Sequence, residues 1–321
     1  MSYTPIHLHT HFSLLDGCIK IPELVDRLVE LKIPACAITD HGVLSGIIDF
    51  YKECRKKNIK YILGCESYLT NDPDDSENRD RRNYHMVLLC KNKTGLENLI
   101  WLTTQANLHN FYYKPRIWIE HFKEHSEGLI ACSACLGGIA SKQLRYEHSI
   151  SKVFVDDYSD FLYKMSWFRE VFRGEFYLEI QDHDFWEQKE FNDFIIDFAR
   201  KEKFPLIITS DAHYLKKEDS YLHEMMMAMQ FKQTLEQYRA GDNMKYGGTN
   251  YVKSYEEMYA AAKKWNAIDA LENTVAIAEK CEDIDLGLNS QYFMPTFDVK
   301  SANDYNDFQK YLKEKNNGYI C

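Results

Sequence analysis

The chain has 321 residues, 45% of them hydrophobic and 27% charged, which is typical of a soluble globular protein with one large or two smaller domains. Its 39 basic and 49 acidic side chains give a net charge of −10, which argues against a protein that coats nucleic acid through bulk positive charge. No apolar run approaches the roughly 18 residues that span a bilayer, and the N-terminus lacks the pattern of a secretion signal. The nine cysteines, mostly in apolar segments, favour reduced thiols and a cytoplasmic location.

Short apolar runs alternate along the chain with segments of helical spacing. The runs predict strands, and they lie at residues 3–10, 34–39, 60–65, 84–90, 128–133, 175–180 and 205–210. Between most of them the apolar spacing predicts helices, at residues 21–32, 95–107 and 184–201. Because the runs are apolar throughout, they indicate parallel strands buried on both faces. About seven such units favour an α/β barrel of the TIM type over an open sheet.

Other segments interrupt this alternation. Residues 71–83 are polar and charged, and they predict an exposed, mobile loop. Residues 244–265 predict a short strand followed by a helix, and residues 267–282 predict a further amphipathic helix before a thin tail. The basic stretch at residues 54–60 is interpreted as the exposed end of a helix.

Ligand-type side chains recur where the predicted strands end. His7 and His9 are two residues apart, so on a strand both side chains point to the same face, and Asp211 and His213 have the same spacing. In parallel barrels, functional residues gather at the carboxyl ends of the strands. The polar residues at those ends are His7, His9, Asp40, His41, Glu66, Cys135, Asp211 and His213. Any one of them could simply cap a strand, but together these imidazoles, carboxylates and a thiol indicate a metal centre.

Six ordered motifs carry a resemblance to a known family. "HLHTHFSLLDG", "ITDHG", "LGCE", "YHMVLLC", "SACLGG" and "SDAHY" resemble the motifs of the polymerase and histidinol phosphatase (PHP) domain. The chain most resembles the form at the N-terminus of bacterial DNA polymerase III alpha subunits, a likeness supported by residues 111–117, 176–184 and 271–286. The resemblance implies a distorted seven-stranded (β/α)7 TIM-like barrel over residues 1–285. Residues 286–321 resemble the start of the polymerase segment that follows.

The resemblance also implies two or three divalent metal ions, drawn from zinc, manganese and iron. The implied ligands are His7, His9, Asp16, His41, Glu66, His85, Cys135, Asp211 and His213. All nine have metal-binding side chains, which favours an active site over a domain that is only structural. Glu66 is the expected bridging carboxylate, and Glu66, Asp211 and His9 are the expected catalytic residues. Asp16 could otherwise be a turn residue before Gly17.

Several neighbouring residues have predicted roles outside the ligand set. His11 is expected to be solvent-facing, with a substrate contact as the alternative. Asp40 is expected to orient an imidazole, and Cys132 to be a buried thiol. Arg79, Arg81 and Arg82 could guide a DNA strand or could simply be solvated.

Candidate substrate-binding residues are Lys114, Arg116 and His183. Lys114 and Arg116 could hold phosphates while Tyr112 or Tyr113 stacks on a base, or the stretch could be a solvated loop. His183 lies in a stretch that matches the family, which makes a role in the substrate pocket a hypothesis.

The leading hypothesis for function is metal-dependent hydrolysis of phosphodiesters, as a 3′→5′ exonuclease on DNA. The alternatives are a small-molecule phosphatase of the histidinol-phosphatase type and a non-catalytic, metal-stabilised module of a DNA polymerase. Expected partners are DNA with a single-stranded or frayed 3′ end and a separate replicative polymerase chain, and no membrane is expected. The chain alone is not expected to extend a primer, and it could be an excised domain or a free-standing protein.

Overall fold

The computed structural model describes residues 2–71, 83–241, 247–288 and 306–311. The chain divides into two units, Met1–Ile284 and Asp285–Cys321. Within the second unit, residues 306–311 are helical, and the likeness of this tail to a polymerase segment stays a prediction. The predicted loop at 71–83, with Arg79, Arg81 and Arg82, falls almost entirely outside the described residues.

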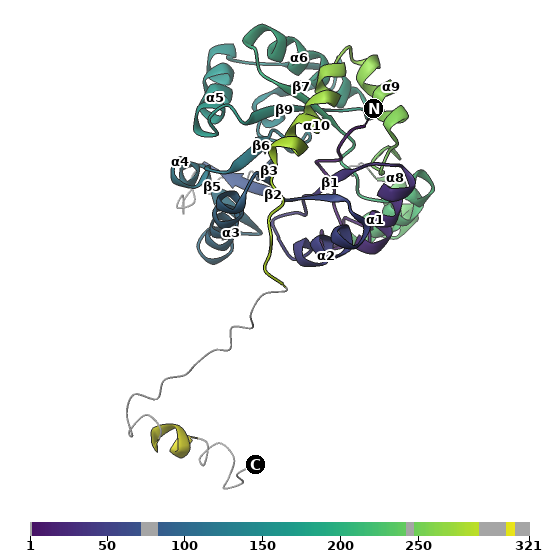
Figure 1. The fold of residues 1–321 in the computed structure, drawn as a ribbon. Helices are drawn as coiled ribbons and strands as arrows, with labels where there is room; N and C mark the ends of the chain where they lie inside the picture. The colour runs from purple at the N-terminus through teal and green to yellow at the C-terminus, as the bar shows by residue number, and fades with distance from the viewer. Residues whose placement is uncertain (1, 72–82, 242–246, 289–305, 312–321) are drawn as a thin grey trace. The chain divides into compact units, whose positions relative to one another are not determined.

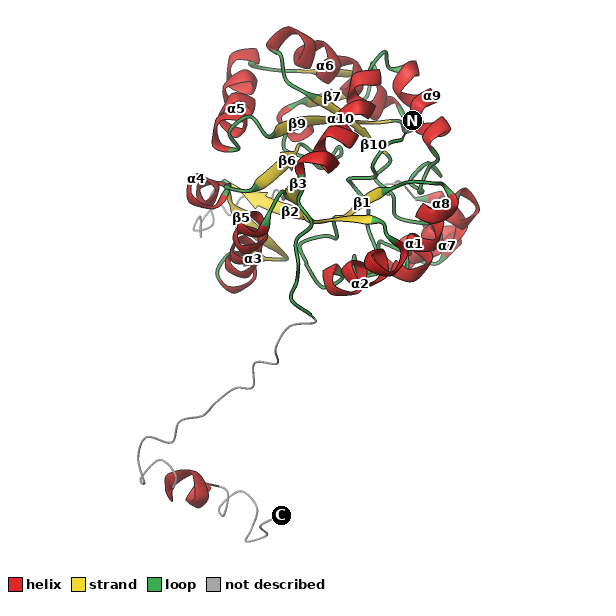
Figure 2. Cartoon of the chain, in the orientation of Figure 1, coloured by secondary structure: helices red, strands yellow, loops and turns green. Residues whose placement is uncertain are grey.

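In the first unit, helices lie on the outside of a curled mixed sheet (Figures 1 and 2). The strands are β1 (Ala35–Ile38), β2 (Lys60–Thr70), β3 (Tyr84–Cys90), β4 (Phe111–Tyr112), β5 (Lys114–Trp118), β6 (Leu129–Cys132), β7 (Arg145–Glu147), β8 (Lys152–Phe154), β9 (Phe176–Gln181) and β10 (Leu206–Thr209). The α-helices are α1 (Ile21–Glu30), α2 (Ile47–Lys57), α3 (Lys93–Leu108), α4 (Phe122–His125), α5 (Tyr158–Val171), α6 (Trp186–Glu202), α7 (Ser220–Gln230), α8 (Leu235–Ala240), α9 (Tyr255–Lys264) and α10 (Ile268–Lys280).

The N-terminal segment closes the curled sheet into a barrel. The main path of the sheet runs β10–β9–β6–β3–β2, with β1 paired to β2. The segment bonds β1 on one side, where Ala37 N donates to Pro5 O at 2.8 Å. On the other side it reaches the residues after β10, where His9 N donates to Ala212 O at 2.8 Å. The circuit therefore has seven members, as predicted, although the run at 3–10 forms isolated bridges rather than a continuous strand.

The prediction of an all-parallel barrel is wrong for β3, which pairs antiparallel with both β2 and β6. A parallel return needs a crossover, usually a helix, whereas an antiparallel return needs only a loop. Residues 71–83, which join β2 to β3, have no apolar face that could pack as a crossover helix. The start of β3 consequently lies where β1, β2 and β6 end. This reversal brings His85, the second residue of β3, to the rim that carries the other predicted ligands.

The predicted helices are confirmed as α1, α3, α6, α9 and α10, and α2 ends in the predicted basic stretch. In α1, Leu24 and Leu28 are four residues apart and both buried, with a proline in the first turn. The strand predicted before α9 is reduced, within residues 247–253, to one bridge between Tyr214 and Tyr251. The barrel interior is apolar, and burying one such side chain contributes roughly 1.5–3 kcal/mol to folding.

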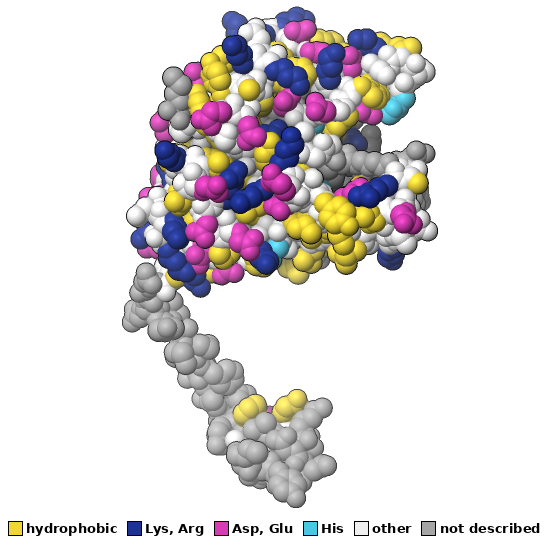
Figure 3. Space-filling model, turned by 90° about the vertical axis from the view of Figure 1, so that its right-hand side faces the viewer, with side chains coloured by type: hydrophobic (Ala, Val, Ile, Leu, Met, Phe, Trp, Pro, Cys, Tyr) yellow, Lys and Arg dark blue, Asp and Glu magenta, His cyan; other side chains and the backbone are white. Residues whose placement is uncertain are grey.

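The surface carries charges of both signs. On the face in Figure 3, Lys and Arg side chains are interspersed with Asp and Glu, in keeping with a chain that is acidic overall. Among the helices that the structure describes, none is long and apolar enough to cross a membrane. The eight cysteines within the described ranges are free thiols, and Cys132 is buried, as predicted.

Candidate metal centre

The structure brings all nine predicted ligands to one rim of the barrel. Seven of them form three overlapping groups in which the ligand atoms lie within 4.8 Å of one another. The groups are His7–His9–Asp211, His41–Glu66–His85 and His9–His41–His213. The other two predicted ligands, Asp16 and Cys135, lie against members of these groups. Their joint role as ligands stays a prediction, but three groups that share members suit a cluster of divalent ions.

Glu66 stands at the centre of this arrangement, on β2. Its Oε1 lies 2.9 Å from His85 Nδ1 and 3.5 Å from His7 Nε2. Its Oε2 lies 2.6 Å from His41 Nδ1 and 3.4 Å from His9 Nε2. Burial alone would raise the pKa of Glu66, but the surrounding imidazoles hold it well below its usual range. A carboxylate with imidazoles on both oxygens is suited to bridge two ions.

The buried polar atoms in the His7–His9–Asp211 group fit a cation. His7 Nε2 lies 3.2 Å and His9 Nε2 3.3 Å from Asp211 Oδ1. Within the residues that the structure describes, these three atoms are buried and make no hydrogen bond. A buried polar atom without a partner costs free energy, and a shared metal ion would satisfy all three at once. The donor set therefore fits a divalent ion.

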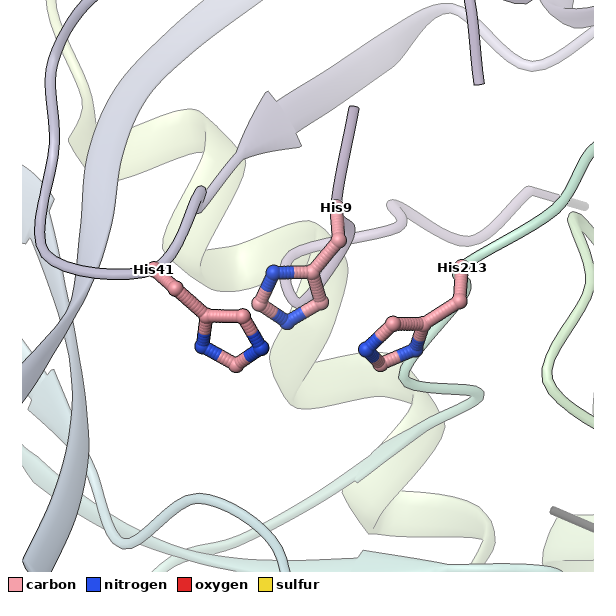
Figure 4. Close-up of side chains that lie close together, drawn as sticks. All are labelled: His9, His41 and His213. Atoms are coloured by element: carbon pink, nitrogen blue, oxygen red, sulfur yellow. The ribbon is translucent and has the colours of Figure 1, made fainter. Parts of the chain in front are cut away.

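His9 and His41 differ sharply in their affinity for protons. Figure 4 shows the His9 ring between those of His41 and His213, and the ring centroids lie 4.1 Å and 4.4 Å from that of His9. Burial and these two neighbours lower the pKa of His9 to about 3, so its imidazole is neutral at neutral pH. Burial also disfavours a charge on His41, but Glu66 and Asp16 outweigh it and raise the pKa of His41 to about 10. Metal binding at His41 must therefore displace a proton.

Asp16, His41 and His213 form a second centre of charge beside Glu66. One oxygen of Asp16 lies 3.0 Å from His41 Nε2 and 3.6 Å from His213 Nε2. The alternative in which Asp16 is only a turn residue does not account for these contacts. Asp211 supports the same region through its backbone, because its carbonyl lies 2.8 Å from His213 Nδ1. Asp211 has a φ of 46°, a conformation that Asp tolerates better than most residues.

Cys135 follows β6 and lies at the edge of the Glu66 group. Its Sγ lies 3.7 Å from His85 Nδ1 and accepts a hydrogen bond from Gly137 N at 3.3 Å. Burial raises the pKa of Cys135 well above its usual value, and Glu66 adds to this. The thiol is therefore protonated without a metal, and it would lose its proton on binding one.

The sequence prediction missed Glu179, which fixes the orientation of His7. Glu179 is fully buried on β9, and its Oε1 lies 2.7 Å from His7 Nδ1. The same oxygen accepts hydrogen bonds from Gln181 and Thr209. Holding the proton on His7 Nδ1 leaves Nε2 free to face the metal centre. A charged residue inside an otherwise apolar run was the available signal.

Asp40 acts on an imidazole through an intermediary rather than by direct contact. Ser13 Oγ donates to Asp40 Oδ1 at 2.8 Å and lies 3.0 Å from His9 Nδ1. Asp40 also accepts hydrogen bonds from the backbone and the hydroxyl of Thr10. The predicted orienting role is therefore supported, with Ser13 as the residue that touches the ring.

His223 on α7 is a second residue that the sequence prediction missed. It is buried, and its Nε2 lies 3.4 Å from Asp16 Oδ1, the oxygen that faces away from His41. Burial lowers the pKa of His223. A lone histidine in a methionine-rich helix is usually a core residue, so the sequence offered no signal for this contact.

The candidate substrate-binding residues lie in two places beside the metal centre. Lys114 and Arg116 lie on β5, which pairs with β2, so the interpretation as a solvated loop is wrong. Lys114 is exposed, whereas Arg116 is buried. His183 is buried, and it lines a cavity of about 860 Å³ with Phe185 and Trp186 among others.

His183 is linked to the metal centre by one residue. The side-chain nitrogen of Asn250 lies 3.5 Å from His183 Nε2 and donates to Asp211 O at 3.1 Å. Burial lowers the pKa of His183 to about 4, so the imidazole is neutral. The substrate roles of Lys114, Arg116 and His183 stay predictions. His11 is solvent-facing, as predicted.

Comparison with known proteins decides the family. Residues 5–183, more than half of the chain, match the family described as "PHP domain". The chain belongs to the PHP domain family. The PHP domain described here also resembles proteins named DNA polymerase III subunit alpha. The relative from Aquifex aeolicus is 36% identical over 97% of this chain and 27% of the relative. The relative from Helicobacter pylori strain 26695 is 38% identical over 89% of this chain and 23% of the relative.

The chain thus spans about a quarter of the length of the curated relatives that it matches. The match to a solved structure from Bifidobacterium adolescentis, described as a metal-dependent phosphoesterase, covers 66% of this chain and 88% of the chain in that structure. The TM-score is 0.44 at 13% identity, a likeness too low to carry an argument about function.

Proposed function

We propose that this PHP domain hydrolyses phosphodiester bonds with two or three divalent ions, of zinc, manganese or iron, and acts as a 3′→5′ exonuclease on DNA. The observation that carries the proposal is the complete set of nine ligand-type side chains converging around Glu66. Bound ions would supply a hydroxide at neutral pH and stabilise the charge on the departing oxygen.

Several side chains of this PHP domain would hold the ions. Glu66 places one carboxylate between the two groups of imidazoles, as its distances to His7 and His85 support. Asp211 presents one oxygen to both His7 and His9. His9 is neutral, so it contributes a lone pair without first losing a proton. These contacts support Glu66, Asp211 and His9 as the residues on which hydrolysis depends.

DNA as the substrate and a polymerase chain as the partner are supported by the named relatives. Each of those relatives is a DNA polymerase III alpha subunit in which this chain matches only a part. A replicative role implies action on a single-stranded or frayed 3′ end and a cytoplasmic location.

The test combines metal analysis with a nuclease assay on one preparation. Elemental analysis should find two or three divalent ions per chain. Single-stranded DNA labelled at its 5′ end should shorten stepwise with manganese and stay intact with a chelator. His9→Ala and Asp211→Asn should abolish the shortening, while the exposed controls His109→Ala and Asp26→Asn should keep it.

Three outcomes would contradict the proposal. Less than one metal equivalent after reloading would remove its basis. Bound metal without hydrolysis of any phosphoester would point to a non-catalytic module. Hydrolysis of small phosphomonoesters without hydrolysis of DNA would point to a phosphatase.

A further inference from the structure

The tip of the β4–β5 hairpin has features that folding stability does not explain. Phe111 is 58% exposed and Tyr113 is 80% exposed. Tyr113 also has a φ of +58°, a left-handed conformation that is an outlier for a bulky residue. Such strain costs on the order of 1 kcal/mol, and glycine would avoid it. An exposed, strained aromatic residue is a reason to look for a binding role.

The hairpin lies directly beside the metal centre. β5 pairs with β2 so that Arg116 stands opposite Tyr68. The ammonium group of Lys114 lies 5.2 Å from the centroid of the Tyr68 ring. That ring lies 5.9 Å from the ring of His41 and 5.1 Å from that of His85. A single aromatic side chain therefore separates Lys114 from two of the predicted metal ligands.

The buried side of the hairpin braces the exposed tip. The guanidinium group of Arg116 lies 5.1 Å from the centroid of the Tyr112 ring. The Tyr112 and Tyr113 rings meet edge to face, with centroids 4.7 Å apart. On the other side of the hairpin, the Pro115 ring packs closely against the backbone of Gly42. The contact is so close that a Cβ atom built on Gly42 would lie 2.9 Å from the Pro115 ring. Arg116 is buried, so it is better placed to support the aromatic tip than to hold a phosphate itself.

We propose that this hairpin tip is a platform on which a base of single-stranded nucleic acid stacks. Tyr113 provides the stacking face, with Phe111 beside it, and Lys114 contacts a backbone phosphate next to the metal centre. Exposed aromatic rings interleaved with a cation form the usual site for single strands, because every base has a face that can stack. The proposal rests on the proposed function in one respect, since it assumes that the strand end continues to the metals.

Nucleic acid is favoured over a protein partner by the position of the cation. The chain is acidic overall, so a strand must be held by a few local cations. Lys114 supplies one on the path between the exposed rings and His41. A surface that only docked a protein would not need its cation beside the metal ligands.

The test measures binding of a short oligodeoxythymidylate to the metal-loaded protein by fluorescence anisotropy. Phosphorothioate linkages at its 3′ end keep the probe intact. Tyr113→Ala should raise Kd roughly 5-fold or more, while Tyr113→Phe should stay within about 2-fold of wild type. Lys114→Met should raise Kd. It should also lower the slope of log Kd against log salt concentration by about one, the value for one lost phosphate contact. The control is Tyr163→Ala, which removes a tyrosine that is 69% exposed on α5 and should change nothing.

A second variant separates binding from folding. Tyr113→Gly relieves the left-handed strain, so it should leave Tm unchanged or raised while it weakens oligonucleotide binding as Tyr113→Ala does. A lowered Tm with unchanged Kd would show that Tyr113 is structural and would overturn the platform. Unchanged oligonucleotide binding together with weakened association of a purified polymerase chain would overturn it in favour of protein docking.

Hydrolysis of a small substrate distinguishes the platform from the nuclease proposal. Bis(p-nitrophenyl) phosphate has no chain of nucleotides that could extend along the hairpin, so its hydrolysis by the metal-loaded wild type reports on the metal centre apart from DNA binding. If wild type binds the oligonucleotide through Tyr113 but hydrolyses nothing, the nuclease proposal fails and the platform stands. If Tyr113→Ala binds and shortens DNA like wild type, the platform fails and the nuclease proposal stands.

Discussion

Replacing Glu179 by glutamine tests how the metal centre is held in place. Glu179 Oε1 lies 2.7 Å from His7 Nδ1 and also accepts hydrogen bonds from Gln181 and Thr209. The glutamine oxygen can keep all three bonds, so the variant removes the charge and places an amide nitrogen where Glu179 Oε2 is buried without a hydrogen bond among the described residues. The negative charge makes His7 a stronger ligand, and losing such an outer carboxylate typically weakens metal binding 10- to 100-fold, or about 1.4–2.7 kcal/mol.

The assay is a competition titration of zinc between the metal-free protein and a chromophoric chelator. Glu175→Gln is the matched control, because Glu175 lies just before the opposite end of β9 and pairs with Lys280 at 2.7 Å. Glu179→Gln should lose affinity in at least one site, and Glu175→Gln should not. Equal zinc affinities for wild type and Glu179→Gln would refute the idea that the carboxylate tunes His7.

Three further predictions follow from contacts elsewhere in the first unit. His223→Ala should weaken one metal site roughly 10-fold or more, because Asp16 loses the imidazole 3.4 Å from its outer oxygen; an unchanged zinc titration would make His223 a core residue only. Asp182→Asn should flatten the loss of stability in acid, measured by urea unfolding at pH 7 and pH 3. Burial opposes ionisation of Asp182, but Lys264 outweighs it and lowers the pKa of Asp182 overall. The ionised carboxylate therefore stabilises the folded protein fully above about pH 3.9, and this contribution is lost as the pH falls further. Equal losses of stability in wild type and Asp182→Asn would contradict this. Added zinc should raise the Tm of the metal-free protein and slow amide exchange at residues 4–10, because a ligand that binds the folded protein stabilises it. A Tm that does not change with zinc would show that zinc does not bind the folded protein.

The barrel could be predicted from the sequence because the alternation of apolar runs and helical spacing is a local signal. The direction of β3 could not be predicted, because the direction of a strand depends on the strands with which it pairs and not on its own residues. His85 illustrates the consequence. It stands at the start of a strand, so a rule based on the carboxyl ends of parallel strands could not find it, whereas the family resemblance did.

The candidate ligands could be picked out because they cluster in short motifs, but the residues that contact and orient them could not. Glu179 and His223 come from distant parts of the chain and meet the site only through the fold. The burial of Arg116 is a third feature of this kind. The stretch around it is polar in sequence, but pairing of β5 with β2 buries its side chain, and its role in substrate binding stays a prediction.

The exposure of the predicted ligands bears on whether bound metals would serve structure or catalysis. Structural metal sites are closed, whereas catalytic sites keep a position open to solvent. The side chains of His7 and His9 are fully buried, but those of His41 and His85 are 15% and 22% exposed. Both of these exposed rings contact Tyr68, the residue over which Lys114 lies. The predicted ligands are therefore fully buried on the side of the barrel core and partly exposed at the rim, where Tyr68 links them to the β4–β5 hairpin. A purely stabilising metal would not require this asymmetry, whereas a strand end that reaches the metals past Tyr113 would.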